Sequence, residues 1–374
     1  MYLPLFSLPQ QKRDSTGMST HRIAPMPVQQ RRSIWPPASF WKALGSHLLI
    51  PLFLAAGMAL AYLGAFHQPE PHDLPVAIVG TGPAADVFAQ TLNDKAAKEL
   101  DVTTVADAST ARAKVKSQEL AAAYETDATH ATIIVSTASS ATTAEAATKL
   151  FLPIAYQQHL PVTIDDVRPA AVKDGTGQGL FFLLVALSVG SYASAIAVAA
   201  VTAKLGMGWR IGIAAGVALV VAGIGVVVAG PVYGVLSGNE WSIWLLGALY
   251  VFGIVTIGIG LHPVLGKWTT PALTMLFVML NFTSSGGIFA ASLSPALFAG
   301  LNTFWNGAAW LDAARALTYF PGQAFGFDGL RLALWATAGI ALIGVTHLLS
   351  ARKRRLADEQ RLVTAAEEES VIAA

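Results

Sequence analysis

The sequence contains no cysteine, and only 13% of its 374 residues are charged. The lack of cysteine excludes a disulfide framework, a thiolate metal site and a cysteine nucleophile. Charged residues make up roughly a quarter of an ordinary soluble domain, so their scarcity argues against a water-soluble globular enzyme. The net charge of +1 gives no general reason to expect a nucleic-acid partner.

Motifs of catalytic and nucleotide-binding centres are also missing. The sequence has no H-E-x-x-H zinc motif, no G-x-S-x-G nucleophile turn and no G-x-x-x-x-G-K-[ST] phosphate loop. Its eight histidines are scattered, and Asp165 and Asp166 are adjacent, so on an extended segment they point to opposite faces. We therefore expect no enzyme, no resident cofactor and no metal ion.

What the sequence has instead is hydrophobic residues, 54% of the total, gathered into long runs. A helix needs about 20 largely apolar residues to cross the hydrocarbon core of a bilayer. The predicted spans are residues 43–66, 179–203, 211–235, 243–261, 271–289 and 330–349. The pattern predicts an α-helical polytopic membrane protein with six transmembrane helices, and its first partner is the lipid bilayer.

Basic residues between the spans predict the orientation of the chain. Lys and Arg accumulate in cytoplasmic segments close to the spans. Lys204 and Arg210 lie between the second and third spans, Lys267 follows the fourth, and Arg352 begins the basic run after the sixth. Both termini are therefore expected in the cytoplasm.

The two ends of the chain are polar. Residues 1–33 hold prolines, glutamines and scattered basic residues and are predicted to be a disordered cytoplasmic tail. Residues 34–66 are predicted to form an interfacial helix and the first span, which we expect to remain as an anchor although Ala59-Leu60-Ala61 has the form of a signal-peptidase site. Residues 351–374 are predicted to be a second cytoplasmic tail.

Residues 67–178 differ from the rest of the chain. They contain eight Lys and Arg against fourteen Asp and Glu, and strand patterns alternate with helix patterns. Such alternation predicts an α/β layer domain. The predicted strands are 74–80, 101–106, 120–125 and 131–137, and the predicted helices are 84–100, 109–117 and 142–158. We expect this inserted domain to be extracytoplasmic, between the first and second spans.

Residues 179–350 are predicted to form a five-span core that contains one irregular segment. Residues 290–329 are fairly apolar but carry Pro295, Asp312, Arg315 and Pro321, so they are too interrupted to span. We expect one or two helices that lie in or dip into the outer leaflet under a cover of protein.

Three stretches carry a resemblance to a known family. They are PVAIVGTGPAADVFAQTLN with the following KVKSQELAAAYE and ATIIVSTA, the approach to the second span at 162–190, and SPALFAGLNTFWNGAAWLDAARALTYFPG at 294–322. Together with the order of spans, they resemble the permeases of the ATP-binding-cassette type-2 exporter superfamily. Within it the chain is most similar to the phage-infection-protein group and its actinobacterial relatives, over about residues 40–350.

The resemblance implies a function and partners. Permeases of this superfamily lack their own nucleotide-binding domain, so a separate P-loop ATPase subunit would bind ATP. The implied assembly is a homodimer or heterodimer with a pathway between the protomers. The expected function is export of an amphipathic or lipid-like substrate; the alternative is a cell-surface receptor or envelope scaffold whose external domain binds a partner.

Three sets of residues are singled out as candidate functional residues. Gly80 to Ala85 fit G-x-G-x-x-A with Asp107 further on, but Pro83 has no N–H to offer a phosphate, so we expect a tight turn. Asp312 and Arg315 are spaced to form a structural ion pair, or Arg315 contacts substrate. The candidate pathway-lining residues, whose alternative role is helix packing, are Asn281, Thr283, Ser284 and Ser285.

Overall fold

The computed structural model describes residues 38–372 except 68, 97 and 237. Among these residues, five helical stretches are long and apolar enough to cross a membrane. They are Ala38–Phe66, Gly179–Thr202, Met207–Val232, Glu240–Ser284 and Gly326–Leu362. The chain is thus mostly helical, as expected of a polytopic membrane protein. The predicted tail at 1–33 and the start of the predicted interfacial helix at 34–37 lie outside the described residues.

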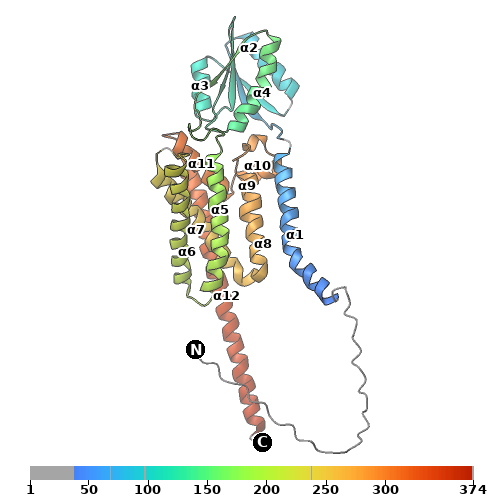
Figure 1. Cartoon of the computed structure of the whole chain (residues 1–374), viewed down its shortest axis with the longest axis vertical. Coiled ribbons are helices and arrows are strands. Elements are labelled where there is room, and N and C mark those ends of the chain that lie inside the picture. Colours follow the sequence, from blue (N-terminus) through green and yellow to red (C-terminus); the bar gives the residue numbers. More distant parts are fainter. Residues whose placement is uncertain (1–37, 68, 97, 237, 373–374) are drawn as a thin grey trace, which may run out of the picture. The chain divides into compact units, whose positions relative to one another are not determined.

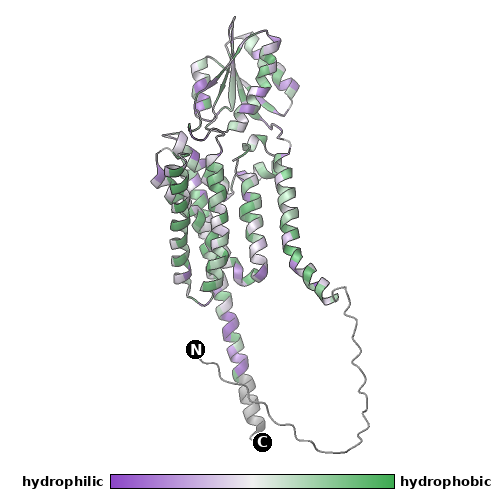
Figure 2. Cartoon of the chain, in the orientation of Figure 1, coloured by the Kyte–Doolittle hydropathy of each residue, from purple (hydrophilic) through white to green (hydrophobic). Residues whose placement is uncertain are grey.

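The long helices coincide with the hydrophobic runs of the sequence, but they begin and end at other residues than predicted. Figure 2 shows that α1 (Ala38–Phe66) and the other long helices, which we call the bundle, are apolar around most of their surface, whereas α12 (Gly326–Ile372) turns polar beyond the bundle. The four longest single helices outside the 240–284 stretch are α1 (Ala38–Phe66), α5 (Gly179–Thr202), α6 (Met207–Val227, followed by π-helical Val228–Val232) and α12 (Gly326–Ile372). The last helix therefore continues without a break through the expected tail after residue 350.

The stretch Glu240–Ser284 consists of two antiparallel halves. The first half is α7 (Glu240–Leu265); after a 3-10 turn at Gly266–Trp268, the second is built of α8 (Thr269–Thr274), the π-helical Met275–Met279 and α9 (Leu280–Ser284). Three contacts join the halves: those of Tyr250 with Asn281, Gly258 with Leu273, and His262 with Thr269. Along these contacts, residues later in the first half meet residues earlier in the second half, so the two halves run antiparallel. The chain reverses near Gly266, which has a φ of 52°.

Helices α7 and α12 pack closely because small residues line their contact. A Cβ atom placed on Gly339 would lie 2.1 Å from Oγ1 of Thr256, and one placed on Gly260 would lie 2.8 Å from Cγ of Leu342. Only glycine allows the helices to approach to this distance. The last helix, α12, therefore packs against α7. The residues of the expected fourth and fifth spans both lie in the stretch Glu240–Ser284.

The segment between α9 and α12 is broken, as the sequence predicts. It contains a 3-10 turn at Ala291–Leu293, α10 (Ala296–Asn302) and α11 (Asn306–Tyr319). The largest side chain of α11, Trp310, is fully buried against the bundle. The predicted fifth span ends earlier than expected, at Ser284, because the chain turns through Gly286, which has a φ of 72°.

Residues 74–166 form a five-stranded sheet with three helices (Figure 1). The strands are β1 (Leu74–Val79), β2 (Leu100–Val105), β3 (Ala122–Thr126), β4 (Ala131–Val135) and β5 (Val162–Asp166), in the order β2-β1-β3-β4-β5. All neighbours are parallel except β3 and β4. The helices are α2 (Pro83–Ala96), α3 (Ala108–Lys116) and α4 (Ala141–Gln157).

Helices cover both faces of the sheet. Side chains of α2 and α4 pack with Tyr124 and Ile133 on one face, where the ring of Phe151 stacks on Tyr124 at 5.1 Å. Helix α3 packs through Ala111 and Val115 on the other face. The predicted strands and helices of this region are found within a few residues, and β5 is an additional strand that the sequence did not predict.

The strand directions bring several chain ends to one edge of the sheet. Because β3 and β4 are antiparallel, the first residue of β3, Ala122, pairs with the last residue of β4, Val135. The start of β1 and the end of β5 lie at the same edge, because β1 is parallel to β3 and β5 is parallel to β4. Both connections to the long helices therefore leave from this edge.

Candidate functional site

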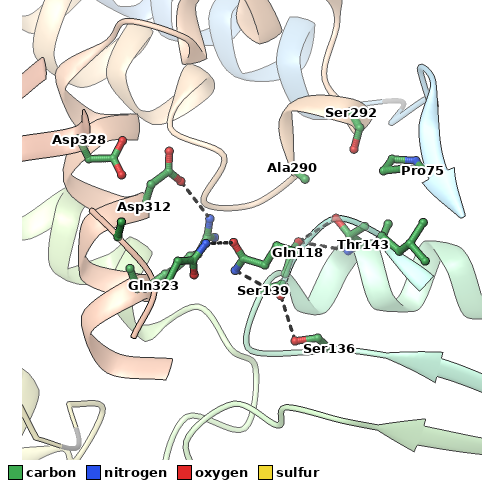
Figure 3. Close-up of a pocket in the computed structure, with 16 residues that line it drawn as sticks. Pro75, Gln118, Ser136, Ser139, Thr143, Ala290, Ser292, Asp312, Gln323 and Asp328 are labelled. Atoms are coloured by element: carbon green, nitrogen blue, oxygen red, sulfur yellow. Dashed lines mark hydrogen bonds and ion pairs between the residues drawn. The ribbon is translucent and has the colours of Figure 1, made fainter. Parts of the chain in front are cut away.

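A polar cavity of about 250 Å³ lies between this sheet edge and the segment that leads into α12 (Figure 3). One wall comes from the starts of β1 and β3, the end of β4 and the first turn of α4. The other comes from residues 290–292, from α11 and from 323–328. Hydroxyl, amide, carboxylate and guanidinium groups line it together.

The sheet-side wall is a chain of hydroxyl and amide groups. The Ser139 hydroxyl donates to Oγ of Ser136 at 2.9 Å, and Nε2 of Gln118 donates to Oγ of Ser139 at 3.4 Å. Ser140 caps α4 by accepting from the backbone N–H of Thr143 at 3.2 Å. These side chains lie here because β4 ends at this edge and α4 begins directly after it.

The helix-side wall carries three charged side chains, Asp312, Arg315 and Asp328, and both aspartates pair with Arg331, which is not among the residues that line the cavity. Nη1 of Arg331 lies 2.9 Å from Oδ1 of Asp328 and 3.6 Å from Oδ2 of Asp312. Nη1 of Arg315 lies 4.0 Å from Oδ1 of Asp312. The predicted pair of Asp312 and Arg315 therefore forms at the outer limit of an ion pair, as part of a cluster in which Arg331 is nearer to Asp312.

Surrounding protein alters the protonation of this cluster. Desolvation raises the pKa of Asp312 from 3.8 to about 6, although 41% of the side chain stays exposed. The positive charges of Arg315 and Arg331 lower this pKa, and the negative charge of Asp328 raises it further. Desolvation also lowers the pKa of Arg315, opposed by Asp312. The cavity thus holds a carboxyl group whose pKa is raised well above that of an ordinary aspartate.

The arginines also bind the backbone of the irregular segment. Nη2 of Arg315 donates to the carbonyl of Gly286 at 2.9 Å, just past the end of α9. Nη2 of Arg331 donates to the carbonyls of Asn302 and, at 3.4 Å, Trp305. Each guanidinium satisfies carbonyls that a broken helix leaves unpaired. The cluster therefore fixes the segment 286–305 as well as the cavity wall.

The four candidate pathway-lining residues are buried in the single chain, with exposed fractions of 0% for Asn281, 3% for Thr283, 1% for Ser284 and 0% for Ser285. The hydroxyls of the last three donate to carbonyls of their own helix. Their lining of a pathway remains a prediction, and the contacts within the chain are those of packed helices.

Asn281 belongs to a buried polar group that the sequence did not reveal. Its Nδ2 donates to Oγ of Ser188 at 3.2 Å and to the hydroxyl of Tyr250, and these two hydroxyls lie 2.6 Å apart. Gly307, the residue after Asn306, lies against this group, since a Cβ at its position would lie 1.9 Å from Oδ1 of Asn281. Both amide atoms of Asn306 are buried without a hydrogen-bond partner among the described residues.

The candidate pathway-lining residues and the charged cluster around Asp312 and Arg315 are linked through the backbone. Nδ2 of Asn302 donates to the carbonyl of Ser284 at 2.8 Å, and Arg331 binds the carbonyl of Asn302. Asp328 and Arg331 are the charged side chains of this cluster that sequence reasoning missed. Their i, i+3 spacing at the start of the last apolar run was the available signal.

The G-x-G-x-x-A turn lies at the opposite edge of the sheet, after the end of β1. Gly80 and Gly82 have φ values of 150° and 107°, and the carbonyl of Gly82 accepts from the backbone N–H of Ala85 at 3.1 Å. Asp107 caps α3 by accepting from the N–H of Thr110 at 2.8 Å, and its hydrogen bonds lower its pKa. These contacts are those of a tight strand-to-helix turn and a helix cap.

The cavity can donate and accept hydrogen bonds to a polar group of modest size. Among the described residues, no three His, Asp or Glu side chains are grouped so as to hold a metal ion. The hydroxyl, amide and charged groups that line the cavity can recognise a polar group by hydrogen bonds and charge. Comparison of the chain with family models, with curated proteins and with solved structures gives no match.

Proposed function

We propose that the chain is a membrane permease subunit of the ATP-binding-cassette type-2 exporter class. In this proposal it moves an amphipathic or lipid-like substrate out across a bacterial plasma membrane. It works as a homodimer or heterodimer and takes its energy from a separate P-loop ATPase. The sequence resemblance is the origin of the proposal, and the arrangement of the helices supports it.

The proposal includes six spans rather than five. The antiparallel contacts within Glu240–Ser284 support two crossings there, because a single straight helix cannot bring Tyr250 beside Asn281. A helix of 45 residues would also be about 68 Å long, more than twice the thickness of the hydrocarbon core. With six spans, both termini lie on the same side.

The placement of the α/β domain outside the cell rests on charge. Lys204, Arg210 and Arg354 line one cavity at the end of the bundle where α5 ends and α6 begins. Since basic residues favour the cytoplasmic side, we assign that end to the cytoplasm. The sheet joins the start of α5, the opposite end of that helix, and so belongs outside.

The single observation that carries the proposal is the polar cavity between the domain and the broken segment. Arg315 and Arg331 hold the broken segment, and the hydroxyl of Thr142 donates to the carbonyl of Ile288, joining the domain to the same segment. A movement of the last helices would therefore change the cavity that faces the domain. A permease that hands cargo to an external domain needs such a connection.

The test is purification of the tagged full-length chain from its native membranes in mild detergent. Mass spectrometry identifies the proteins that stay bound, and ATP hydrolysis of the mixture is measured. We expect a P-loop ATPase in stoichiometric amount and an ATPase activity that copurifies with the tag. Repeated recovery of the chain without such a subunit, under conditions that keep the chain folded, would count against the exporter.

The alternative function, a surface receptor or envelope scaffold, is favoured by one observation. Asn281, Thr283, Ser284 and Ser285 are packed among helices of their own chain, so they form no open path in the protomer. In this alternative the spans serve as an anchor and the domain binds a partner. A chain that purifies without an ATPase but with one stoichiometric extracellular or envelope protein would support it.

A further inference from the structure

A second cavity, of about 510 Å³, lies at the end of the bundle away from the sheet. Its walls come from the end of α5, the connection to α6, the end of α7 and the part of α12 that leaves the bundle. Lys204, Arg210 and Arg354 line it with His262 and His347. Among the described residues that line it, none is acidic, so the charged side chains of its wall are all basic.

Arg210 is the best evidence that this cavity is built for a ligand. The residue is only 5% exposed, and one guanidinium nitrogen, Nη2, donates to the carbonyl of Ile259 at 3.0 Å. Its Nε is buried without a hydrogen-bond partner, and no carboxylate of the described chain pairs with it. A buried arginine without a counter-ion is costly unless a ligand supplies the negative charge.

The start of α6 adds a second, independent attraction for an anion. The helix begins at Met207 after Gly206, which has no side chain to cap it. The first N–H groups of a helix lack partners within the helix, and the positive end of its dipole lies there. Gly206 lines the cavity, so this uncapped end lies at the cavity wall. Backbone N–H groups at such an end bind phosphate and similar oxyanions.

We propose that this cavity is a binding site for a phosphate group. A guanidinium binds two phosphate oxygens at once, and a lysine adds a mobile positive charge. The cavity is larger than a single inorganic phosphate requires, and Leu205 and Pro263 add apolar wall. The phosphate can therefore belong to a lipid headgroup at the membrane surface or to a free phosphate compound, and basic pockets between membrane helices bind headgroups of this kind.

The test compares two double variants of the full-length chain. The first, Lys204→Gln with Arg354→Gln, removes two charges from the cavity. The second, Lys353→Gln with Arg355→Gln, removes two exposed charges of α12 that do not line the cavity. Each purified protein is stripped of lipid in detergent, and its melting temperature is measured against phosphatidylglycerol in mixed micelles. A second arm uses inorganic phosphate at constant ionic strength. Phosphatidylcholine, whose zwitterionic headgroup has no net charge, is the control for lipid binding without net negative charge.

We expect at least one phosphate probe to raise the melting temperature of the wild-type chain and of the Lys353/Arg355 variant. The Lys204/Arg354 variant should need about tenfold more of the same probe, because it has lost charge-assisted hydrogen bonds. A response to phosphatidylglycerol alone identifies a lipid headgroup, and a response to inorganic phosphate identifies a free phosphate compound. Equal responses of the two variants, or no response of the wild-type chain to either probe, would overturn the proposal.

Discussion

Buried and half-buried charges are the most informative single residues in this chain. Arg331 has only 9% of its side chain exposed and binds Asp328, Asp312 and two backbone carbonyls. Arg315 is 14% exposed and binds a carbonyl at the end of α9. Buried guanidinium groups need such partners, and breaking a buried pair costs more than its formation gains. Both arginines therefore act first as structural clamps on the broken segment.

Replacing Arg331 by alanine should lower the free energy of unfolding by about 3 kcal/mol, because it leaves Asp328 and two carbonyls unpaired. Lys149→Ala is the matched control: its pair with Glu145 has an N–O distance of 2.6 Å but is 73% and 63% exposed. Loss of an exposed pair of this kind costs about 0.5 kcal/mol. Denaturant unfolding in detergent micelles measures both values, and equal effects would refute the clamp role of Arg331.

The carboxyl of Asp312 gives a pH dependence of stability with a definite sign. Its pKa is raised from 3.8 to about 6, so between these values the folded chain binds more protons than the unfolded chain. The stabilising contribution of the protonated group is complete below 3.8 and is lost as the pH rises through 6. Arg315, Arg331 and Asp328 are the charged groups that face it.

We therefore compare the wild-type chain with Asp312→Asn, which carries no titrating group at this position. The difference in melting temperature, wild type minus variant, should fall as the pH rises from 4 to 7. Melting curves in detergent at constant ionic strength give this difference. Parallel curves over that range would show that Asp312 titrates alike in the folded and unfolded chain.

Sequence patterns reveal part of these residue-level contacts. Asp312 and Arg315 stand out because charges at i, i+3 interrupt an apolar segment. Arg331 is harder to find, because its carbonyl partners at 302 and 305 are distant in sequence and meet it only after the helices pack. The contacts of Ser188 with Tyr250 and Asn281 are missed for the same reason.

At the scale of elements, the hydrophobic runs predict the long helices well, and their ends less well. Helix α12 continues to Ile372 because the residues after the basic run are mostly Ala, Glu, Leu and Arg, which are strong helix formers. Strand β5 is missed because VTIDD has only two apolar residues and lies at the edge of the sheet. Short edge strands leave little pattern in a sequence.

The reversal between α7 and α8 depends on Gly266, so its substitution tests this element. With a φ of 52° and a ψ of −120°, Gly266 adopts a conformation that residues with a Cβ avoid. A Cβ atom would meet no other atom there, so the expected loss of about 1–2 kcal/mol for Gly266→Ala arises from the backbone alone.

Gly216→Ala is the control for this substitution. Gly216 lies inside α6, and a Cβ at its position also meets no other atom. Alanine is favoured over glycine inside a helix by about 1 kcal/mol, so this variant should be as stable as the wild type or more stable. If both variants unfold at the wild-type denaturant concentration, Gly266 imposes no strain and the reversal does not depend on it.

At the scale of the whole chain, two cavities of different chemistry lie at opposite ends of α5. The one beside the sheet contains hydroxyls, amides and both signs of charge, whereas the other is basic. In the proposed permease, the cavity beside the sheet would face the cargo and the basic cavity would face the cytoplasm. The sequence predicts this asymmetry from the positions of Lys and Arg, and the cavities themselves require the folded chain.

The central claim is a six-span chain with the α/β domain outside and the carboxyl terminus inside. The absence of cysteine allows single-cysteine variants to be labelled without background. Ala128→Cys, Lys267→Cys and Lys353→Cys place one exposed thiol in the domain, at the turn before α8 and on α12 beyond the bundle. A membrane-impermeant maleimide is applied to intact cells and to opened cells.

We predict that Ala128→Cys reacts in intact cells and that Lys267→Cys and Lys353→Cys react only after the membrane is opened. Five spans, with Glu240–Ser284 crossing once, would instead place residues 128 and 353 on the same side. Labelling of Lys353→Cys in intact cells together with Ala128→Cys would therefore contradict the six-span account.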